Sequence, residues 1–305
     1  MHLEVESVER LRFGDGSPVR AASAVVRFAD GFLVVSDDAT HAAWFRGRSV
    51  AAVRLLPPVY GHDLFSGAAG TKHLKPDLEA ACHLTVDEEP AVLVLGSGSS
   101  PARMRWVLLR LERGEPRTIV TDLAPLYPRV ADALSVAPDD LNLEGACVVG
   151  DALRWFHRGL PAAGQSSMSI DLDLAAARAA LSGHADPVTV PMGDPRTYVV
   201  ADAAGQPLAL TDVVTLPDGA MVASAVAEDS PNPRDDGPVL ASALVRLDDA
   251  GVRDVVSLPP VDGDVVKIEG LMVLEADEDG TLLLAVADVD DPGAASLALR
   301  LRLRH

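Results

Sequence analysis

Glu144-Gly145-Ala146-Cys147 opens an apolar strand with an acidic residue, a small residue and then apolar side chains. The same order recurs three times, and a fifth stretch has serine in place of the acid: Glu79-Ala80-Ala81-Cys82, Asp212-Val213-Val214-Thr215, Glu269-Gly270-Leu271-Met272 and Ser23-Ala24-Val25-Val26. From Ser23 onward, successive starts lie 56, 65, 68 and 57 residues apart. A repeat of this kind predicts a fold built from equivalent units.

Each unit continues with further short apolar runs that are separated by turns. Asp-Gly dipeptides, which favour tight hairpins, accompany these runs at Asp30-Gly31, Asp218-Gly219 and Asp279-Gly280. Helical pattern is limited to residues 127–134 and 173–181, which are too short for the crossovers of a parallel sheet. Antiparallel units of this length are typical of propeller blades. We therefore predict an all-β propeller of five blades, with six blades as the alternative count and a β-sandwich as the competing fold.

The two ends of the sequence carry similar alternating patterns. Residues 3–8 and 297–303 both alternate apolar and polar side chains, as half-buried strands do. We expect the N-terminal strand to close the ring by pairing with the last blade, which hides an edge strand. Proline and glycine are spread evenly and no linker divides the chain, so residues 1–305 are predicted to form a single domain.

The charge and composition limit the expected partners and location. The formal net charge is −19, and such an acidic protein repels nucleic acid and anionic membranes at long range. No apolar run approaches the roughly 20 residues that cross a bilayer, and the first residues lack the pattern of a secretory leader. Only Cys82 and Cys147 are cysteines, and both are expected to be buried small hydrophobic residues. These features favour a cytoplasmic protein that binds neither nucleic acid nor membranes.

The acids of the repeat are the candidate site. Innermost propeller strands line the central channel, so equivalent residues lie at the same height around the axis. We expect the acids to converge there as metal ligands, with Ser23 completing the ring: Glu79, Glu144, Asp212 and Glu269. Converging carboxylates need compensation, and their oxygen atoms suit Ca²⁺ or, second, Mg²⁺. Alternatively, each carboxylate accepts backbone N–H groups of the neighbouring blade.

Basic residues lie close to these acids in the sequence. Lys75, Arg158 and Lys267 either pair with the acids or, with Arg103 and Arg105, bind an anionic part of a small-molecule substrate beside a cation. The stretch Gly96-Ser97-Gly98-Ser99 lacks the Gly-Lys ending of a phosphate-binding loop. It is expected to form a blade hairpin whose serines reach the channel mouth.

Several stretches resemble an uncharacterised bacterial family of predicted propellers: Lys75-Pro76-Asp77-Leu78-Glu79, Leu95-Gly96-Ser97-Gly98-Ser99, Leu141-Asn142-Leu143-Glu144-Gly145 and Lys267-Ile268-Glu269-Gly270. More distantly, the sequence is similar to calcium-activated nucleotidases (apyrases), five-bladed propellers with Ca²⁺ in the central tunnel. The Glu269-Gly270 start resembles theirs and that of esterase-like phytases and gluconolactonases. Residues 154–159 resemble the arginine-bearing stretch of the nucleotidases. The resemblance implies a propeller whose inner-strand glutamates hold a metal.

Two classes of function follow from the sequence. The first is a metal-dependent hydrolase of a small phosphorylated or lactone-type molecule at the channel mouth. The second is a non-catalytic propeller that binds a ligand or a protein on its loop-rich face. A convergent polar pocket favours the first, whereas a flat apolar rim favours the second.

Overall fold

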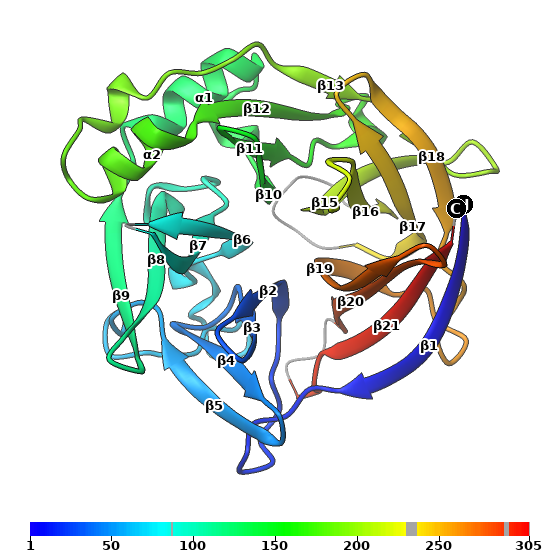
Figure 1. The fold of residues 1–305 in the computed structure, drawn as a ribbon, viewed down its shortest axis with the longest axis horizontal. Helices are drawn as coiled ribbons and strands as arrows, with labels where there is room; N and C mark the ends of the chain where they lie inside the picture. The colour runs from blue at the N-terminus through cyan, green and yellow to red at the C-terminus, as the bar shows by residue number, and fades with distance from the viewer. Residues whose placement is uncertain (87, 230–236, 290–292, 305) are drawn as a thin grey trace.

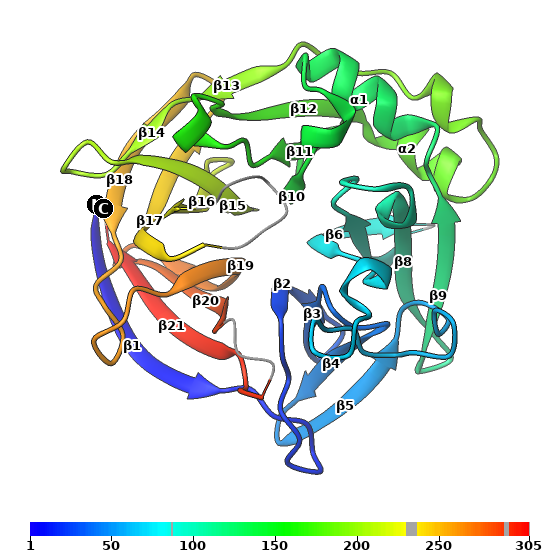
Figure 2. The same ribbon diagram turned by 180° about the vertical axis from the view of Figure 1, so that it is seen from behind.

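The structure is a ring of five antiparallel sheets around a central axis (Figure 1). It is a computed structural model that describes residues 1–86, 88–229, 237–289 and 293–304. Figure 2 shows the same ring of blades from behind. The predicted five-bladed propeller is confirmed, and the alternatives of six blades and a β-sandwich are wrong.

The sheets follow one another along the chain, and we number the blades in that order. The strands of the first blade are β2 (Ala22–Phe28), β3 (Gly31–Ser36), β4 (His41–Arg46) and β5 (Ser49–Arg54). Those of the second are β6 (Leu78–Val86), β7 (Glu89–Gly96), β8 (Arg105–Glu112) and β9 (Glu115–Asp122). Those of the third are β10 (Leu143–Val149), β11 (Ala152–His157), β12 (Ser167–Asp173) and β13 (Arg196–Tyr198).

The fourth and fifth blades depart from this simple order. The fourth has five strands, namely β14 (Val200–Ala201), β15 (Pro207–Thr215), β16 (Met221–Glu228), β17 (Val239–Asp248) and β18 (Gly251–Ser257). The fifth combines both ends of the chain in β19 (Lys267–Asp277), β20 (Gly280–Asp288), β21 (Leu297–Arg304) and β1 (His2–Arg10). In this blade β1 pairs antiparallel with β21, from His2 opposite Arg304 to Arg10 opposite Leu297. The predicted closure of the ring is therefore confirmed.

The core lies between the faces of neighbouring blades, and two helices extend it at the third blade. The helices α1 (Leu126–Leu134) and α2 (Leu174–Leu181) lie at the outer rim beside β12 (Figure 1). The ring of Trp155 packs edge-on against Trp106 and Tyr127, with centroids 5.3 and 5.1 Å apart. Short 3₁₀ helices span Lys72–Leu74, Pro101–Arg103, Pro138–Asp140, Pro161–Ala163 and Pro187–Thr189. Within the described ranges, no helix is long and apolar enough to cross a membrane.

Candidate functional site

A β-bulge in every innermost strand sets the geometry of the channel mouth. In β2, β6, β10, β15 and β19 the pairing with the next strand shifts by one residue at an equivalent place, and β19 has a second shift between Val273 and Glu275. At the equivalent shifts the extra residues are Ser23, Glu79, Glu144, Thr211 and Glu269. Bulges re-aim a side chain, and the repetition of this one in all five blades gives these residues equivalent places around the axis.

The fourth bulge corrects one expectation from the sequence. Thr211, not Asp212, is the residue equivalent to the glutamates. Asp212 is not among the residues that line the polar cavity, and its Oδ2 accepts a hydrogen bond from the backbone N–H of Leu271 at 2.7 Å. It therefore has the role considered as the alternative, that of a carboxylate bonded to the backbone of the next blade.

The two hydroxyl residues of the ring also fasten neighbouring blades. Ser23 Oγ donates to the carbonyl oxygen of Leu78 at 2.6 Å. Thr211 Oγ1 donates to the carbonyl oxygen of Ile268, also at 2.6 Å. Each acceptor immediately precedes the next bulge, so the same bond recurs at two blade junctions.

The Glu-Gly pairs of the repeat have a packing reason. A Cβ on Gly270 would lie 2.7 Å from both the Cα of Ala24 and the backbone nitrogen of Val25. A Cβ on Gly145 would lie 3.2 Å from the Cα of Asp212. Glycine after the glutamate therefore lets the innermost strand of one blade approach the backbone of the next.

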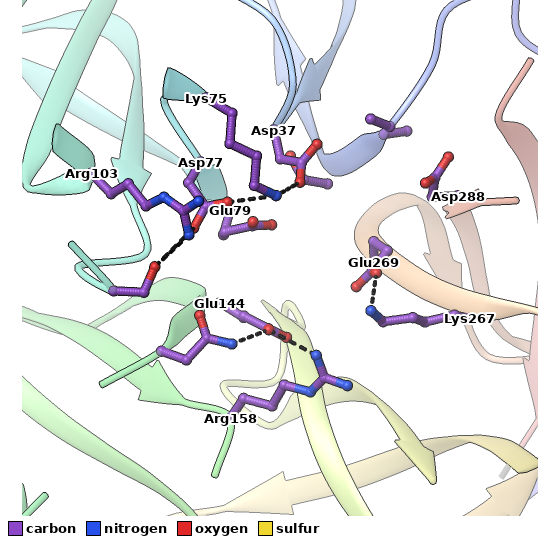
Figure 3. A pocket seen from close by; sticks show the side chains of 15 residues that line it. Asp37, Lys75, Asp77, Glu79, Arg103, Glu144, Arg158, Lys267, Glu269 and Asp288 are labelled. Carbon is purple, nitrogen blue, oxygen red and sulfur yellow. Dashed lines mark hydrogen bonds and ion pairs between the residues drawn. The ribbon is translucent and has the colours of Figure 1, made fainter. Parts of the chain in front are cut away.

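The three glutamates and their neighbours line a small polar cavity at one end of the channel (Figure 3). The carboxyl groups of Glu79, Glu144 and Glu269 surround a shared opening in this view. The cavity has a volume of about 70 Å³. Its charged lining residues are Asp37, Lys75, Asp77, Glu79, Arg103, Glu144, Arg158, Lys267, Glu269 and Asp288.

One side of the cavity is organised around Lys75 and Asp77. The ammonium of Lys75 contacts Asp37 Oδ2 and lies 2.6 Å from Asp77 Oδ1. Arg103 Nη1 donates to Asp77 Oδ2 at 2.8 Å, and Ser97 and Ser99 donate to the same oxygen. Burial alone would raise the pKa of Asp77, but Lys75 and Arg103 lower it to about 2. Asp77 is therefore ionised at neutral pH.

The opposite side is organised around Arg158 and Lys267. Glu144 Oε1 accepts from Asn142 Nδ2 at 2.7 Å and from Arg158 Nη1 at 3.1 Å. Arg158 also contacts Glu228 through Nη2, and Lys267 Nζ lies 2.8 Å from Glu269 Oε1. Burial raises the pKa of Glu269 to about 8, because the nearby Glu144 adds to the effect and Lys267 offsets only part of it.

Two carboxylates keep unused acceptor capacity. Among the described residues, Glu79 has no hydrogen bond or ion pair, and burial together with Asp77 and Asp37 raises its pKa well above the usual value. Glu144 is only 7% exposed, and its Oε2 is buried without a partner in the described part of the chain. An unpartnered buried acceptor is costly, so Glu144 would gain from a cation, and Glu79 lies beside it as a further oxygen donor.

The lining therefore holds more acidic than basic side chains. Six carboxyl groups face four basic side chains, an excess of two negative charges if all are ionised. Ligand atoms of Asp37, Asp77 and Glu79 also lie within 4.8 Å of one another. Oxygen donors of this kind fit Ca²⁺ or Mg²⁺, although the Lys75 ammonium now lies between Asp37 and Asp77.

The structure thus brings most of the predicted site residues together. Glu79, Glu144 and Glu269 line the cavity, and so do the four basic residues predicted for substrate binding: Lys75, Arg103, Arg158 and Lys267. Arg105 does not line it, whereas Ser99 of the glycine-serine hairpin does. Sequence reasoning missed Asp37, Asp77, Asp288 and Glu228 as site residues. A signal was present for three of them, since Asp37, Glu228 and Asp288 occur at polar ends of second strands.

The other end of the channel is mostly apolar, although Arg27 and His83 also line it. Its lining comes from the same five strands and includes the predicted buried cysteines, Cys82 and Cys147. Burial raises the pKa of Cys147 to about 12 and that of Cys82 further. Neither thiol is a reactive thiolate at neutral pH, and the polar cavity is the better candidate for chemistry.

Several solved structures are similar to this chain at low sequence identity. A hypothetical protein from Leishmania major has a TM-score of 0.50 and 12% identity, over 99% of this chain and 91% of that one. The glutaminyl cyclase of Myxococcus xanthus has a TM-score of 0.47 and 11% identity, over 99% and 96%. A protein of unknown function from Dyadobacter fermentans has a TM-score of 0.42 and 10% identity, over 99% of both chains. These likenesses concern the fold alone.

Sequence comparison gives one further result. No protein of curated function matches this sequence. None of the three structures above is a calcium-activated nucleotidase or a phytase, so that distant resemblance stays an expectation. The expected likeness to an uncharacterised family is confirmed, because residues 71–292 match a family of unknown function, DUF6910. The cavity residues from Lys75 to Asp288 fall within the matched range, and the chain belongs to this family.

Proposed function

We propose that the polar cavity binds a divalent cation, Ca²⁺ before Mg²⁺, and that the loaded site hydrolyses a small neutral ester such as a lactone. The observation that supports it is the excess of carboxylates over basic side chains in the cavity lining. A doubly charged cation offsets an excess of two negative charges, and Glu79 and Glu144 have free acceptor atoms to offer it.

The bulge glutamates are the proposed ligands. Glu79, Glu144 and Glu269 come from three different innermost strands and surround one opening (Figure 3). Asp37 and Asp77 are further oxygen donors beside Glu79. Ca²⁺ accepts six to eight oxygen ligands in flexible geometry, whereas Mg²⁺ demands a near-ideal octahedron. Carboxylates arranged around an open mouth, with water completing the shell, favour the larger ion.

The charge balance also favours a neutral substrate over a phosphorylated one. A cation of charge +2 would leave the lining without excess positive charge, and Arg103, Arg158 and Lys267 already pair with carboxylates. The site would therefore have little electrostatic attraction for an anionic phosphate group, whereas a neutral carbonyl group does not depend on such attraction. We therefore place the lactone-type substrate first and the phosphorylated one second.

The reaction follows ordinary ester chemistry. When bound, a divalent cation would polarise a carbonyl group and lower the pKa of water. Water adds to the carbonyl carbon, the ring C–O bond breaks, and the proton from water reaches the departing oxygen, which gives a hydroxy acid. We assign the transfer of this proton to Glu79, the cavity carboxylate without a hydrogen-bond or ion-pair partner among the described residues. Arg158 and Asn142 hold Glu144 in position.

The second candidate is a binding propeller without a metal. It is favoured by the position of Lys75, whose ammonium lies between Asp37 and Asp77 and already offsets part of their charge. In this alternative the cavity carboxylates are held by Lys75, Arg158 and Lys267, and the excess charge is removed by protons.

Thermal unfolding with added cation tests the cation site. Ligand at one hundred times its dissociation constant stabilises the folded state by about 2.7 kcal/mol, so Ca²⁺ should raise the melting temperature by several degrees. Glu79→Gln and Glu144→Gln should lose this rise. Asp212→Asn is the matched control, because it removes a buried carboxylate outside the cavity lining and should keep the rise. A melting temperature indifferent to Ca²⁺, Mg²⁺ and chelator would refute the cation site.

Proton release from δ-valerolactone, followed at constant pH, tests the reaction separately. We expect Ca²⁺-dependent hydrolysis that Glu79→Gln abolishes, because this variant loses a proposed cation ligand together with the group assigned to proton transfer. Cation binding without hydrolysis of this or other small lactones would leave a cation-binding propeller and contradict the catalytic part of the proposal.

A further inference from the structure

A second hollow lies beside the polar cavity, on the first blade. Its volume is about 760 Å³, which is within the usual range of small-molecule sites. Its wall combines the segment between β1 and β2 with residues of β3, β4 and β5. The side chains used below are Phe13, Pro18, Arg20, Asp38, His41 and Leu64.

The groove and the cavity share one wall. Along the chain, Asp37 lines the cavity and Asp38 lines the groove, and in the same way Ala21 lines the cavity and Arg20 the groove. Arg20 Nη2 lies 3.3 Å from Asp38 Oδ2 and joins the two segments. The groove therefore lies directly beside the cavity, with only this wall between them.

The groove combines an apolar surface with polar groups, which include Asp15, Arg20 and Asp38. Leu64 is 48% exposed, and the rings of Phe13 and His41 have centroids 5.8 Å apart. At the shared wall, Asp38 Oδ1 is buried and has no hydrogen-bond partner among the described residues. An apolar ring would cover Phe13 and Leu64, and an N–H or O–H group near that ring would satisfy Asp38.

We propose that this groove binds the apolar, ring-bearing substituent of a substrate whose carbonyl group enters the polar cavity. The inference rests on the proposed function for the carbonyl end and extends it to a substrate class, the aryl-substituted esters and lactones. Burying one ring contributes enough free energy to tighten binding about tenfold or more. The groove thus separates aryl-bearing substrates from small unsubstituted ones.

Equilibrium binding of two amides tests the groove without catalysis. The probes are 3-phenylpropanamide, which carries a ring and N–H donors, and propanamide, which lacks the ring. By calorimetry, wild-type protein should bind the phenyl compound at least tenfold more tightly. Phe13→Ala and Leu64→Ser should reduce that ratio to less than threefold. Leu240→Ser, which changes an exposed leucine outside the groove, is the matched control and should keep the full ratio.

Hydrolysis of dihydrocoumarin and δ-valerolactone links the groove to the reaction. We expect kcat/KM for the aryl lactone to exceed that for δ-valerolactone by at least tenfold, and Leu64→Ser to remove most of the difference. Equal affinity of wild-type protein for the two amides would overturn the groove, even if both lactones are hydrolysed. A tenfold amide ratio that Phe13→Ala and Leu64→Ser leave intact would overturn it as well. A ratio that these variants remove, with neither lactone hydrolysed, would sustain the groove and refute only the proposed catalysis.

Discussion

The first and fourth blades place a hydroxyl group at the bulge, whereas the second, third and fifth place a carboxylate there. The short side chains of Ser23 and Thr211 donate to the backbone of the next blade. The longer side chain of Glu79 extends into the cavity, where no described side chain pairs with it. The same backbone position therefore has two roles. A short hydroxyl side chain there hydrogen-bonds to the next blade, whereas a longer carboxylate side chain lines the cavity.

The largest effect should come from filling the space beside the glycine that follows the bulge glutamate in the third and fifth blades. Gly270→Ala puts a Cβ against the backbone of Ala24 and Val25, and we expect it to destabilise the fold by about 3 kcal/mol or more. Gly145→Ala, with its nearest contact at 3.2 Å, should cost less. Gly67→Ala is the control, because its Cβ meets nothing within 4 Å. Urea unfolding measures all three, and equal stability of Gly270→Ala and Gly67→Ala would contradict the packing argument.

The third blade differs from the others by a buried histidine beside its bulge. His157 pairs with Leu143, next to Glu144, and burial lowers its pKa from 6.5 to about 4. Between pH 6.5 and about 4, His157 is therefore protonated in the unfolded chain but neutral in the folded chain. Stability should fall as the pH drops through this range, by about 3 kcal/mol at most.

His157→Asn should lack this part of the acid sensitivity, and an Asn oxygen can still accept from the backbone N–H of Asn142. Denaturant unfolding at several pH values between 7.5 and 4.5 gives the difference between the two proteins. A difference that stays constant with pH would show that His157 does not titrate as the structure indicates.

The smallest effect should come from removing one hydroxyl group that hydrogen-bonds to the next blade. Thr211→Val keeps the shape of the side chain but loses the bonds to Ile268 O and Ser224 Oγ, which we expect to cost about 1–3 kcal/mol. Thr211→Ser should recover most of the loss. Neither change should alter the shift of melting temperature by Ca²⁺. A lost Ca²⁺ response at unchanged stability would place Thr211 among the ligands instead.

The architecture could be predicted from the sequence because the starts of the innermost strands form a recognisable repeat. Five starts, the hairpin dipeptides and the alternating ends predict the ring and its closure by β1 and β21. The prediction was wrong at Asp212 because the repeats were aligned by their acidic residues. In the structure the bulges are the equivalent positions, and the fourth blade has Thr211 at its bulge.

The ion pairs of the site were harder to predict for a different reason. Arg158 pairs with Glu144 on its own blade, but also with Glu228, which lies 70 residues away in the sequence and on the next blade. Which acids a given base reaches depends on the angle between neighbouring blades. The sequence repeat provided no indication of Asp77 as a site residue. Its partners Lys75, Ser97 and Arg103 come from the segment before β6 and from the segment between β7 and β8, which come together only in the folded blade.

The pairing of β1 with β21 also has a kinetic consequence. His2 meets Arg304, so the seam closes a loop of nearly the whole chain, which costs about 5 kcal/mol of entropy if the loop is treated as flexible. Contacts between such distant residues form slowly, and we expect the fifth blade to be the last to assemble and the first to open. Until then the apolar edge of β21 is unprotected, and a second unfinished ring offers a β1 strand that fits it. Refolding at high protein concentration should therefore produce strand-exchanged dimers joined at this seam.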